Sequence, residues 1–328
     1  MAIHKIQLQN FTIFKDLTVQ LSPGVNVLVG ENGTGKTHFL KAIYALSRIR
    51  TSEKTDISLG NIFGVKSIDG NLQNDNAKNI SICVVANDVD SIEFSIPYAN
   101  GTRNYEISEP KDNYLATFIP AKDMLTHSKG LLAMMEKYRD FPFDQTLTDI
   151  ISKAMQWKLK NPPEIALKIM PMLETMMDGV VEIVDEEFFI HKHDGRMVSF
   201  AVEAEGLKKV GLLWQLLMNE NITEKTVLLW DEPEANLNPK FLPILVDCLL
   251  ELSRYGVQIV VSTHNYIFAK YFDVKAKTED NRLYHSFYLT EARVACESKE
   301  HFADLKHNSI TATFDKLLNE VYDLNMGD

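Results

Sequence analysis

The residues from Gly30 to Thr37, GENGTGKT, have the types and spacing of a phosphate-binding loop. In the pattern G-x-x-x-x-G-K-[ST], backbone N–H groups surround a β-phosphate, the lysine neutralises β- and γ-phosphate charge, and the hydroxyl is a ligand for Mg²⁺. An apolar run precedes the loop, and apolar residues at helical spacing follow it. The sequence therefore predicts an ATP and Mg²⁺ site whose nucleotide contacts are made by Asn32, Gly33, Thr34, Gly35, Lys36 and Thr37.

A second apolar run, VLLW, ends in Asp231 and Glu232. A carboxylate at the end of a buried strand can hold the ligand shell of Mg²⁺, and the carboxylate after it can act as a general base on the attacking water. Taken alone, this pair before Pro233 is typical of a solvated turn. Following a phosphate-binding loop, it predicts Thr37 and Asp231 as metal ligands and Glu232 as a catalytic residue.

The segment VQIVVSTHN, residues 257–265, places His264 just after another apolar strand. A single histidine at the end of a strand is most often structural. This one follows the Asp-Glu strand and one intervening helix, where its imidazole can sense a γ-phosphate. We therefore predict His264 as a second catalytic residue.

The elements that position these motifs begin with strands. Apolar alternation and apolar runs predict strands over residues 3–11, 16–21 and 25–30. Apolar residues at helical spacing predict a helix from Lys36 to about Ile49. Residues 51–79 are rich in Asn, Asp, Ser and Gly, a composition typical of a loop.

The middle of the chain changes from β-type to helical patterns. Short β-type runs recur between about 80 and 120, with a hairpin signal at Asn100 and Gly101, and predict antiparallel strands. Helical runs separated by prolines occupy residues 121–179. From about 180 onward, β-type runs and helices alternate, which indicates an α/β fold.

Composition narrows the class of protein. The chain has 328 residues, 45% of them apolar and 24% charged, with a formal net charge of −11. This charge argues against a surface built uniformly for DNA or an anionic membrane, and leaves DNA binding uncertain. Three separated cysteines indicate neither a disulfide framework nor a zinc site. With no signal peptide and no apolar run of about 18 residues, we expect a cytoplasmic protein outside membranes.

The motifs, in this order and after this strand-rich start, resemble the ABC/SMC-like ATPases, which include RecF-type and OLD-type proteins. The resemblance covers nearly the whole chain. It implies an α/β fold, an ABC-type P-loop NTPase head with an antiparallel β subdomain and an inserted helical lobe. We expect the head at residues 1–120 and 180–328 and the lobe at 121–179. It also implies head-to-head association of two copies, in which the signature helix of each caps the partner's nucleotide, or a larger ring of such dimers.

The signature segment departs from the family pattern. The aligned residues are EAEGLKK at 203–209, with Gly206 kept and Ala204 standing where the family has serine. Backbone N–H groups starting near Gly206 can still meet a partner's phosphate, so we expect Gly206 to contact nucleotide in trans. The alternative is that residues 203–219 form an amphipathic core helix.

Two further family features have weaker matches. EPEANLNP at 232–239 resembles the D-loop, which makes Asn236 and Asn238 candidates for contacts across a dimer; the alternative is an ordinary turn. The Q-loop position falls to Lys122 or Asp123, against a plain strand-to-helix connection.

Two groups of residues favour a structural interpretation. Eight of the 12 methionines lie between Met124 and Met177, where core filling is favoured over an adaptable partner surface. Several lysines could touch phosphates, but interspersed lysines on helices are usually solvated: Lys153, Lys158, Lys160, Lys208 and Lys209.

The segments FIPAKDML, AEGLKKVGLLWQLL and DEPEANLNP resemble compact bacterial AAA/ABC ATPases that accompany an effector in anti-phage defence, such as the ATPase partner of a TOPRIM-like nuclease in PARIS-type systems. This resemblance implies an ATPase that acts as a sensor and scaffold for a separate effector. A RecF-like ATPase that clamps DNA is one alternative. An assembly platform that binds ATP with negligible turnover is another.

Overall fold

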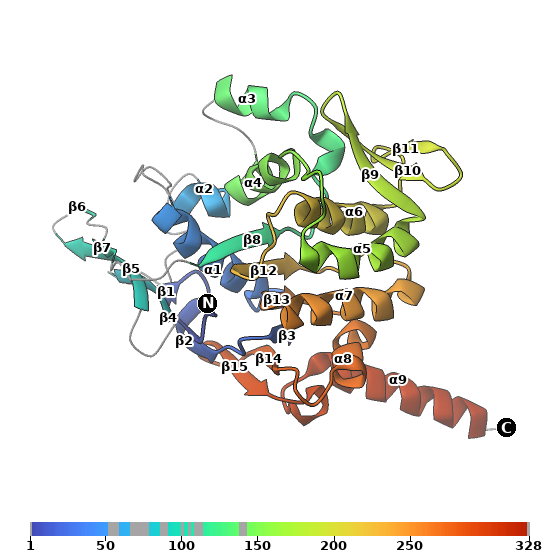
Figure 1. The fold of residues 1–328 in the computed structure, drawn as a ribbon. Helices are drawn as coiled ribbons and strands as arrows, with labels where there is room; N and C mark the ends of the chain where they lie inside the picture. The colour runs from blue at the N-terminus through green and yellow to red at the C-terminus, as the bar shows by residue number, and fades with distance from the viewer. Residues whose placement is uncertain are drawn as a thin grey trace.

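A mainly parallel, six-stranded sheet forms the centre of the protein in the computed structural model (Figure 1). The structure describes residues 2–51, 59–65, 79–85, 91–99, 102–103, 106–107, 114–137 and 143–326. In spatial order the strands are β15 (Val294–Lys299), β14 (Arg282–Leu289), β3 (Val25–Gly30), β13 (Gln258–Ser262), β12 (Thr226–Asp231) and β8 (Leu115–Ile119). β15 pairs antiparallel with β14, and the other neighbours pair in parallel. The carboxyl ends of β3, β12 and β13 therefore meet at one edge, where ligands bind in such sheets.

Both faces of this sheet are covered, as β12 shows. Val227 and Leu229 pack into one hydrophobic cluster, whereas Leu228 and Trp230 pack into another on the opposite face. All four side chains are fully buried. This burial explains why the strand reads as a continuous apolar run rather than an alternating one.

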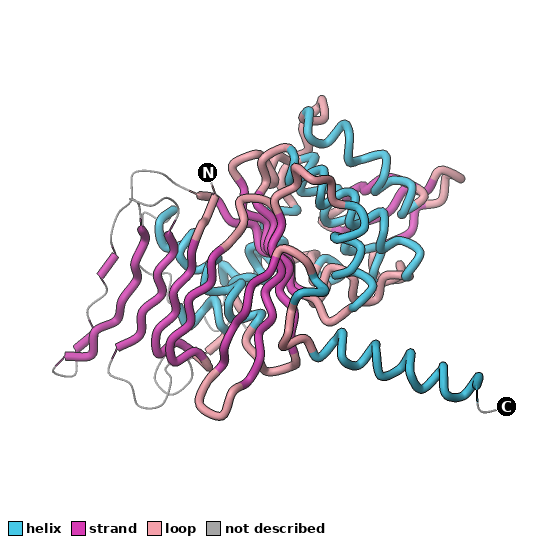
Figure 2. Tube along the Cα trace, turned by 90° about the horizontal axis from the view of Figure 1, so that it is seen from below, coloured by secondary structure: helices cyan, strands magenta, loops and turns pink. Residues whose placement is uncertain are grey.

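An antiparallel sheet lies beside the central one (Figures 1 and 2). Its strands are β1 (Lys5–Phe11), β2 (Phe14–Gln20), β4 (Asn79–Val85), β5 (Ser91–Ala99), β6 (Thr102–Arg103) and β7 (Glu106–Ile107). The helix α1 (Lys36–Thr51) contributes Phe39, Leu40, Ile43 and Leu46 to a cluster shared by both sheets. The helix that opens at the phosphate-binding loop is thus clamped between them.

The predicted loop at 51–79 contains a short helix, α2 (Leu59–Phe63). A five-residue helix with three apolar side chains is too short for a helical period to be detected in the sequence. Most of that stretch, and the hairpin signal at Asn100 and Gly101, lie outside the described residues.

The predicted helical lobe contains α3 (Leu131–Lys137), α4 (Gln145–Ala154) and α5 (Glu164–Met177). A three-stranded antiparallel sheet follows, composed of β9 (Gly179–Val184), β10 (Glu187–Lys192) and β11 (Met197–Ser199). α5 packs against both α6 (Glu205–Met218) and α7 (Leu242–Arg254), and all three share one hydrophobic cluster. The boundaries at 121 and 179 stay a prediction, because the cores of lobe and head are continuous.

Six of the eight methionines between Met124 and Met177 pack into the core, as predicted, whereas Met134 is 51% exposed. Met124, Met176 and Met177 are buried, and Met155, Met170 and Met172 pack partly buried against the same cluster.

The expectation that the lysines of this region are solvated is wrong for Lys153 and Lys158. Lys153 Nζ donates to the carbonyl of Ala116 at 2.9 Å and to Thr117 Oγ1 at 2.8 Å, and burial lowers its pKa to about 8. Lys158 Nζ donates to the carbonyl of Val181. Both ammonium groups therefore satisfy buried oxygens of the fold, whereas Lys160 is exposed.

The C-terminal region adds α8 (Tyr266–Lys275) and α9 (Ser309–Met326). α9 is anchored at its start, where the rings of Tyr266 and Phe314 stack with centroids 4.0 Å apart. Its other end projects from the body of the molecule (Figures 1 and 2). None of the helices in the described ranges combines the length and apolar character needed to cross a membrane.

Candidate functional site

The loop between β3 and α1 has the backbone shape of a phosphate cradle. Gly30 and Gly35 have φ angles of 143° and 86°. A Cβ on Gly30 would lie 2.2 Å from the carbonyl oxygen of Phe287, and a Cβ on Gly35 would lie 2.5 Å from the ring of Phe14. Glycine is required at both positions because neighbouring strands approach so closely. Inside the loop, Thr34 Oγ1 donates to the carbonyl of Glu31 at 2.8 Å.

Lys36 folds back over this loop. Its Nζ donates to the carbonyl oxygens of Gly30 and Glu31, both at 2.8 Å. Burial lowers the pKa of Lys36 to about 8, although Asp231 and Glu232 oppose the shift. The ammonium sits where the first turn of α1 also leaves backbone N–H groups without intrahelical acceptors. These donors fit a polyphosphate.

A hydroxyl and a carboxylate meet beside the lysine. Thr37 Oγ1 donates to Asp231 Oδ2 at 2.8 Å, and Ser262 Oγ donates to Asp231 Oδ1. Asp231 ends β12 and is buried, with 7% of its surface exposed. Mg²⁺ prefers oxygen ligands and usually takes one or two from protein, with phosphates and water supplying the others. Thr37 and Asp231 fit that role, whereas Ser262 was not predicted because a serine ending a strand carries no distinctive signal.

Glu232 and His264 face each other across the ends of β12 and β13. Glu232 Oε1 lies 3.6 Å from His264 Nε2, and the two side chains are 38% and 34% exposed. Burial, and then the charge of Lys36, lower the pKa of His264 below its ordinary value. The imidazole is therefore neutral at neutral pH. The structure thus brings Glu232 and His264 together with Lys36, Thr37 and Asp231, as the order of motifs predicted.

The candidates for the Q-loop position sit after β8. Asp123 lies just before the turn at Leu125–His127 and bonds to its first residues: Oδ1 accepts from the N–H of Leu125 at 3.0 Å, and Oδ2 accepts from the hydroxyl of Thr126. Both oxygens are thus used within the turn, which favours a plain strand-to-helix connection for Asp123. Lys122 is exposed.

The signature segment begins α6 as predicted. Ala204 occupies the N-cap and makes no side-chain capping bond. Gly206 is buried, and a Cβ there would lie 2.5 Å from the carbonyl oxygen of Asn236 and 2.6 Å from Cα of Leu237. Glycine at 206 therefore has a packing reason within the chain, and its contact with nucleotide in trans stays a prediction. Asn238 Oδ1 accepts from the N–H of Lys240 at 3.1 Å, which is the ordinary-turn alternative.

Lys208 and Lys209 contradict the expectation of solvated lysines, since each is only 4% exposed. Lys208 Nζ donates to Thr126 Oγ1 at 3.1 Å and to Glu205 Oε1 at 2.6 Å. Lys209 Nζ donates to the carbonyl oxygen of Glu232 at 2.8 Å. Sequence reasoning missed Lys209 as a neighbour of the site because nothing local predicts that a backbone carbonyl 23 positions away will receive its ammonium.

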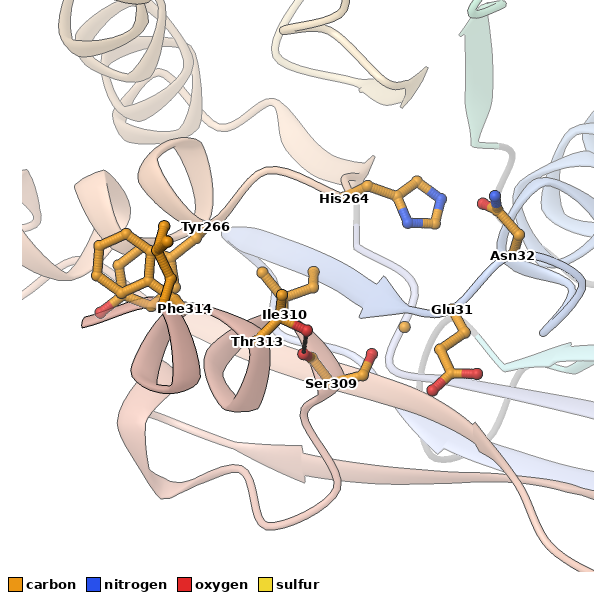
Figure 3. Close-up of a pocket in the computed structure, with 10 residues that line it drawn as sticks. Glu31, Asn32, His264, Tyr266, Ser309, Ile310, Thr313 and Phe314 are labelled. Atoms are coloured by element: carbon orange, nitrogen blue, oxygen red, sulfur yellow. Dashed lines mark hydrogen bonds between the residues drawn. The ribbon is translucent and has the colours of Figure 1, made fainter. Parts of the chain in front are cut away.

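Two hollows flank the loop. One, with a volume of about 410 Å³, is lined by Glu31, Asn32 and His264 and by the first half of α9. In Figure 3, His264 and Asn32 lie on one side of this hollow, and Ser309 and Thr313 lie across from them. The other, of about 470 Å³, is lined by Gly33, by the turn after β1 and by residues 289–294. The loop is thus open on both sides.

The comparisons with known proteins agree with this site. A family model described as an AAA ATPase domain matches residues 1–172, and one described as "AAA domain, putative AbiEii toxin, Type IV TA system" matches residues 127–269. The DNA replication and repair protein RecF of Limosilactobacillus reuteri is 27% identical over 193 residues, which cover 55% of this chain and 48% of that protein. RecF of Chlamydia caviae is 41% identical over 64 residues, 20% of this chain and 17% of that one. The longer of these matches thus spans about half of the curated relative.

Solved structures confirm the predicted fold class. The SMC head domain from Thermotoga maritima aligns with a TM-score of 0.52 and 18% identity, covering 92% of this chain and all of that one. An SMC head bound to the C-winged helix domain of ScpA aligns with a TM-score of 0.55 and 14% identity, covering 92% and 99%. By its fold, its loop and these matches, the chain belongs to the AAA ATPase domain family and is a P-loop ATPase of the ABC/SMC/RecF type.

Proposed function

We propose that this protein binds ATP with Mg²⁺, hydrolyses it slowly, and uses the bound state to control a separate effector protein in anti-phage defence. The observation that carries the ATPase part is the contact between Thr37 and Asp231, which joins the phosphate-binding loop to the end of β12. Lys36 and the first turn of α1 hold the phosphates. Glu232 accepts a proton from the attacking water, and the neutral imidazole of His264 orients it. A bound Mg²⁺ supplies charge neutralisation at the phosphates.

Phosphate release tests this part directly. The natural chain should release phosphate in a Mg²⁺-dependent manner, and Glu232→Gln should bind ATP while losing turnover. Lys36→Ala should lose ATP binding. Equal, near-zero rates in the natural chain and in Glu232→Gln would contradict hydrolysis. The alternative would then be an assembly platform that binds ATP without turnover, which Ala204 at the signature position supports.

Three observations support a protein partner. One matching family model is described as a putative AbiEii toxin of a type IV toxin–antitoxin system. One structural neighbour, an SMC head, is bound to a domain of ScpA. The projecting part of α9 exposes apolar side chains that water solvates poorly: Leu317, Leu318, Val321, Tyr322 and Leu324. We propose an effector of the nuclease or toxin class, a TOPRIM-like nuclease included, together with self-association of the ATPase into a head-to-head dimer or a ring of dimers.

The native mass of the complex tests the partner proposal. The protein, coexpressed with the product of a neighbouring gene, should form a complex whose mass changes when ATP is added. The RecF relatives favour one second candidate, a DNA-binding repair ATPase. Salt-sensitive binding of duplex DNA at physiological ionic strength, without a stable protein complex, would favour that candidate instead.

A further inference from the structure

The backbone of Glu232 is held in a conformation that a glutamate rarely adopts. Its φ is 48°, in the left-handed region that is unfavourable for a residue other than glycine. Its N–H donates to the carbonyl oxygen of Ser262 at 3.1 Å. Its own carbonyl oxygen accepts the 2.8 Å bond from Lys209 Nζ. The residue is therefore fixed from one side by β13 and from the other by α6.

Glu234 is the carboxyl group that acts most strongly on the ammonium of Lys209. Glu234 is buried, with 8% of its surface exposed, and its Oε1 accepts a hydrogen bond from the hydroxyl of Thr263. Among the described residues, its Oε2 has no hydrogen-bond partner. Burial lowers the pKa of Lys209, and Glu234 is the carboxylate that opposes this shift most. Glu234 therefore offsets part of the cost of burying the ammonium beside the carbonyl that it holds.

The fixed backbone of Glu232 determines where its carboxylate points. With its backbone pinned at both ends, the side chain leaves the turn toward His264 and stops 3.6 Å from Nε2. We infer that Lys209 is a positioning residue for Glu232: its bond to the carbonyl keeps the left-handed turn, and the turn aims the carboxylate at the space beside His264. This inference rests on the proposed role of Glu232 as the base in ATP hydrolysis.

Lys209→Met tests the inference, because methionine keeps much of the length and removes the donor and the charge. The matched control is Lys208→Met, since Lys208 is equally buried and donates to Thr126 and Glu205 instead of Glu232. Lys209→Arg, which keeps a charged donor, should restore part of the effect. If Lys209→Met fails to fold, the paired variant Lys209→Met with Glu234→Gln removes both buried ionisable groups and takes its place.

The first readout needs no nucleotide. The pKa of His264 is measured by NMR titration of the imidazole, assigned with His264→Gln. Burial and Lys36 lower this pKa, whereas Glu232 and Asp231 raise it. When Glu232 is no longer aimed at the ring, the pKa should fall toward the value found in Glu232→Gln. Lys208→Met should match the natural chain, and Lys209→Arg should lie between.

The second readout is steady-state hydrolysis. Lys209→Met should lower kcat about 10- to 100-fold, a large part of what a positioned general base contributes, and change KM less than about twofold. An unchanged His264 pKa in Lys209→Met, or an unchanged kcat where the natural chain turns over, overturns the inference. A natural chain without turnover whose His264 pKa still falls in Lys209→Met supports the positioning and counts against the proposed hydrolysis.

Discussion

The hydroxyl of Thr37 and the carboxylate of Asp231 are joined by a 2.8 Å hydrogen bond although the two residues are 194 positions apart in the chain. Thr37 lies in the first turn of α1 and Asp231 is the last residue of β12. The parallel sheet brings both to one edge, because the carboxyl ends of its strands coincide there. Two oxygen ligands for one ion are therefore already neighbours.

Thr37→Val should remove the benefit of Mg²⁺ for ATP binding. Valine keeps the shape of the side chain and deletes the hydroxyl ligand, so ATP affinity in Mg²⁺ should fall about 10-fold toward the metal-free value. Calorimetric titrations with Mg²⁺ and with EDTA measure this difference. Thr34→Val is the control and should keep the effect of Mg²⁺ on ATP affinity, because the Thr34 hydroxyl donates to the carbonyl of Glu31 and is not a predicted metal ligand. A full Mg²⁺ effect in Thr37→Val would speak against Thr37 as a ligand.

ATP affinity should depend on pH through Lys36. Burial lowers the pKa of Lys36 to about 8, and only the protonated amine attracts phosphate. Affinity should therefore be flat below that pH and fall up to about tenfold per unit above it, with proton uptake on binding. Titrations from neutral to alkaline pH, in two buffers of different ionisation enthalpy, measure both. Lys36→Arg should bind with no such pH dependence, and unchanged affinity in Lys36→Ala would refute the site.

The candidate site could be predicted from the sequence where local patterns encode it. Lys36 and Thr37 belong to one loop, and Asp231 and Glu232 end one apolar run. The parallel sheet then brings those two segments together. The sequence motifs therefore predict the site correctly, because residues at the carboxyl ends of parallel strands must lie at the same edge of the sheet.

The lysines were mispredicted because their surroundings are not encoded in the local sequence. Lys153, Lys208 and Lys209 look like solvated residues in any local window, and each satisfies buried oxygens supplied by distant segments. Gly206 shows the same limit. Its family position implies a role in trans, whereas its burial against Asn236 and Leu237 depends on how the loop after β12 folds.

Glu234→Gln should change the pH dependence of stability. Burial raises the pKa of Glu234 to about 7, from an ordinary value of 4.5 that the unfolded chain keeps. The folded state therefore binds the proton more tightly, and its advantage is complete below pH 4.5 and lost as the pH rises through 7. The loss amounts to at most about 3 kcal/mol.

Urea unfolding of both proteins at pH 4.5 and pH 8 measures this effect. The free energy of unfolding of Glu234→Gln, minus that of the natural chain, should be larger at pH 8 than at pH 4.5. The reason is that glutamine never carries the buried charge. Glu224→Gln, at an exposed position, should show no such gain. An equal difference at both pH values would mean that Glu234 does not titrate in this range.

Ala204→Ser separates a helix cap from a contact between copies. Ala204 has φ −62° and ψ 133°, the extended geometry of an N-cap, and lacks a capping side chain. Serine should accept from the N–H of Gly206 or Leu207 and raise the unfolding free energy by about 1 kcal/mol. Ala204→Asp should cap α6 equally well but repel a phosphate held by a second copy. If α6 caps nucleotide in trans, turnover per subunit should rise with protein concentration in Ala204→Ser and stay low in Ala204→Asp. If both variants are equally stabilised and have the same turnover at every protein concentration, residue 204 acts only as a cap of α6 and does not contact the nucleotide of a second copy.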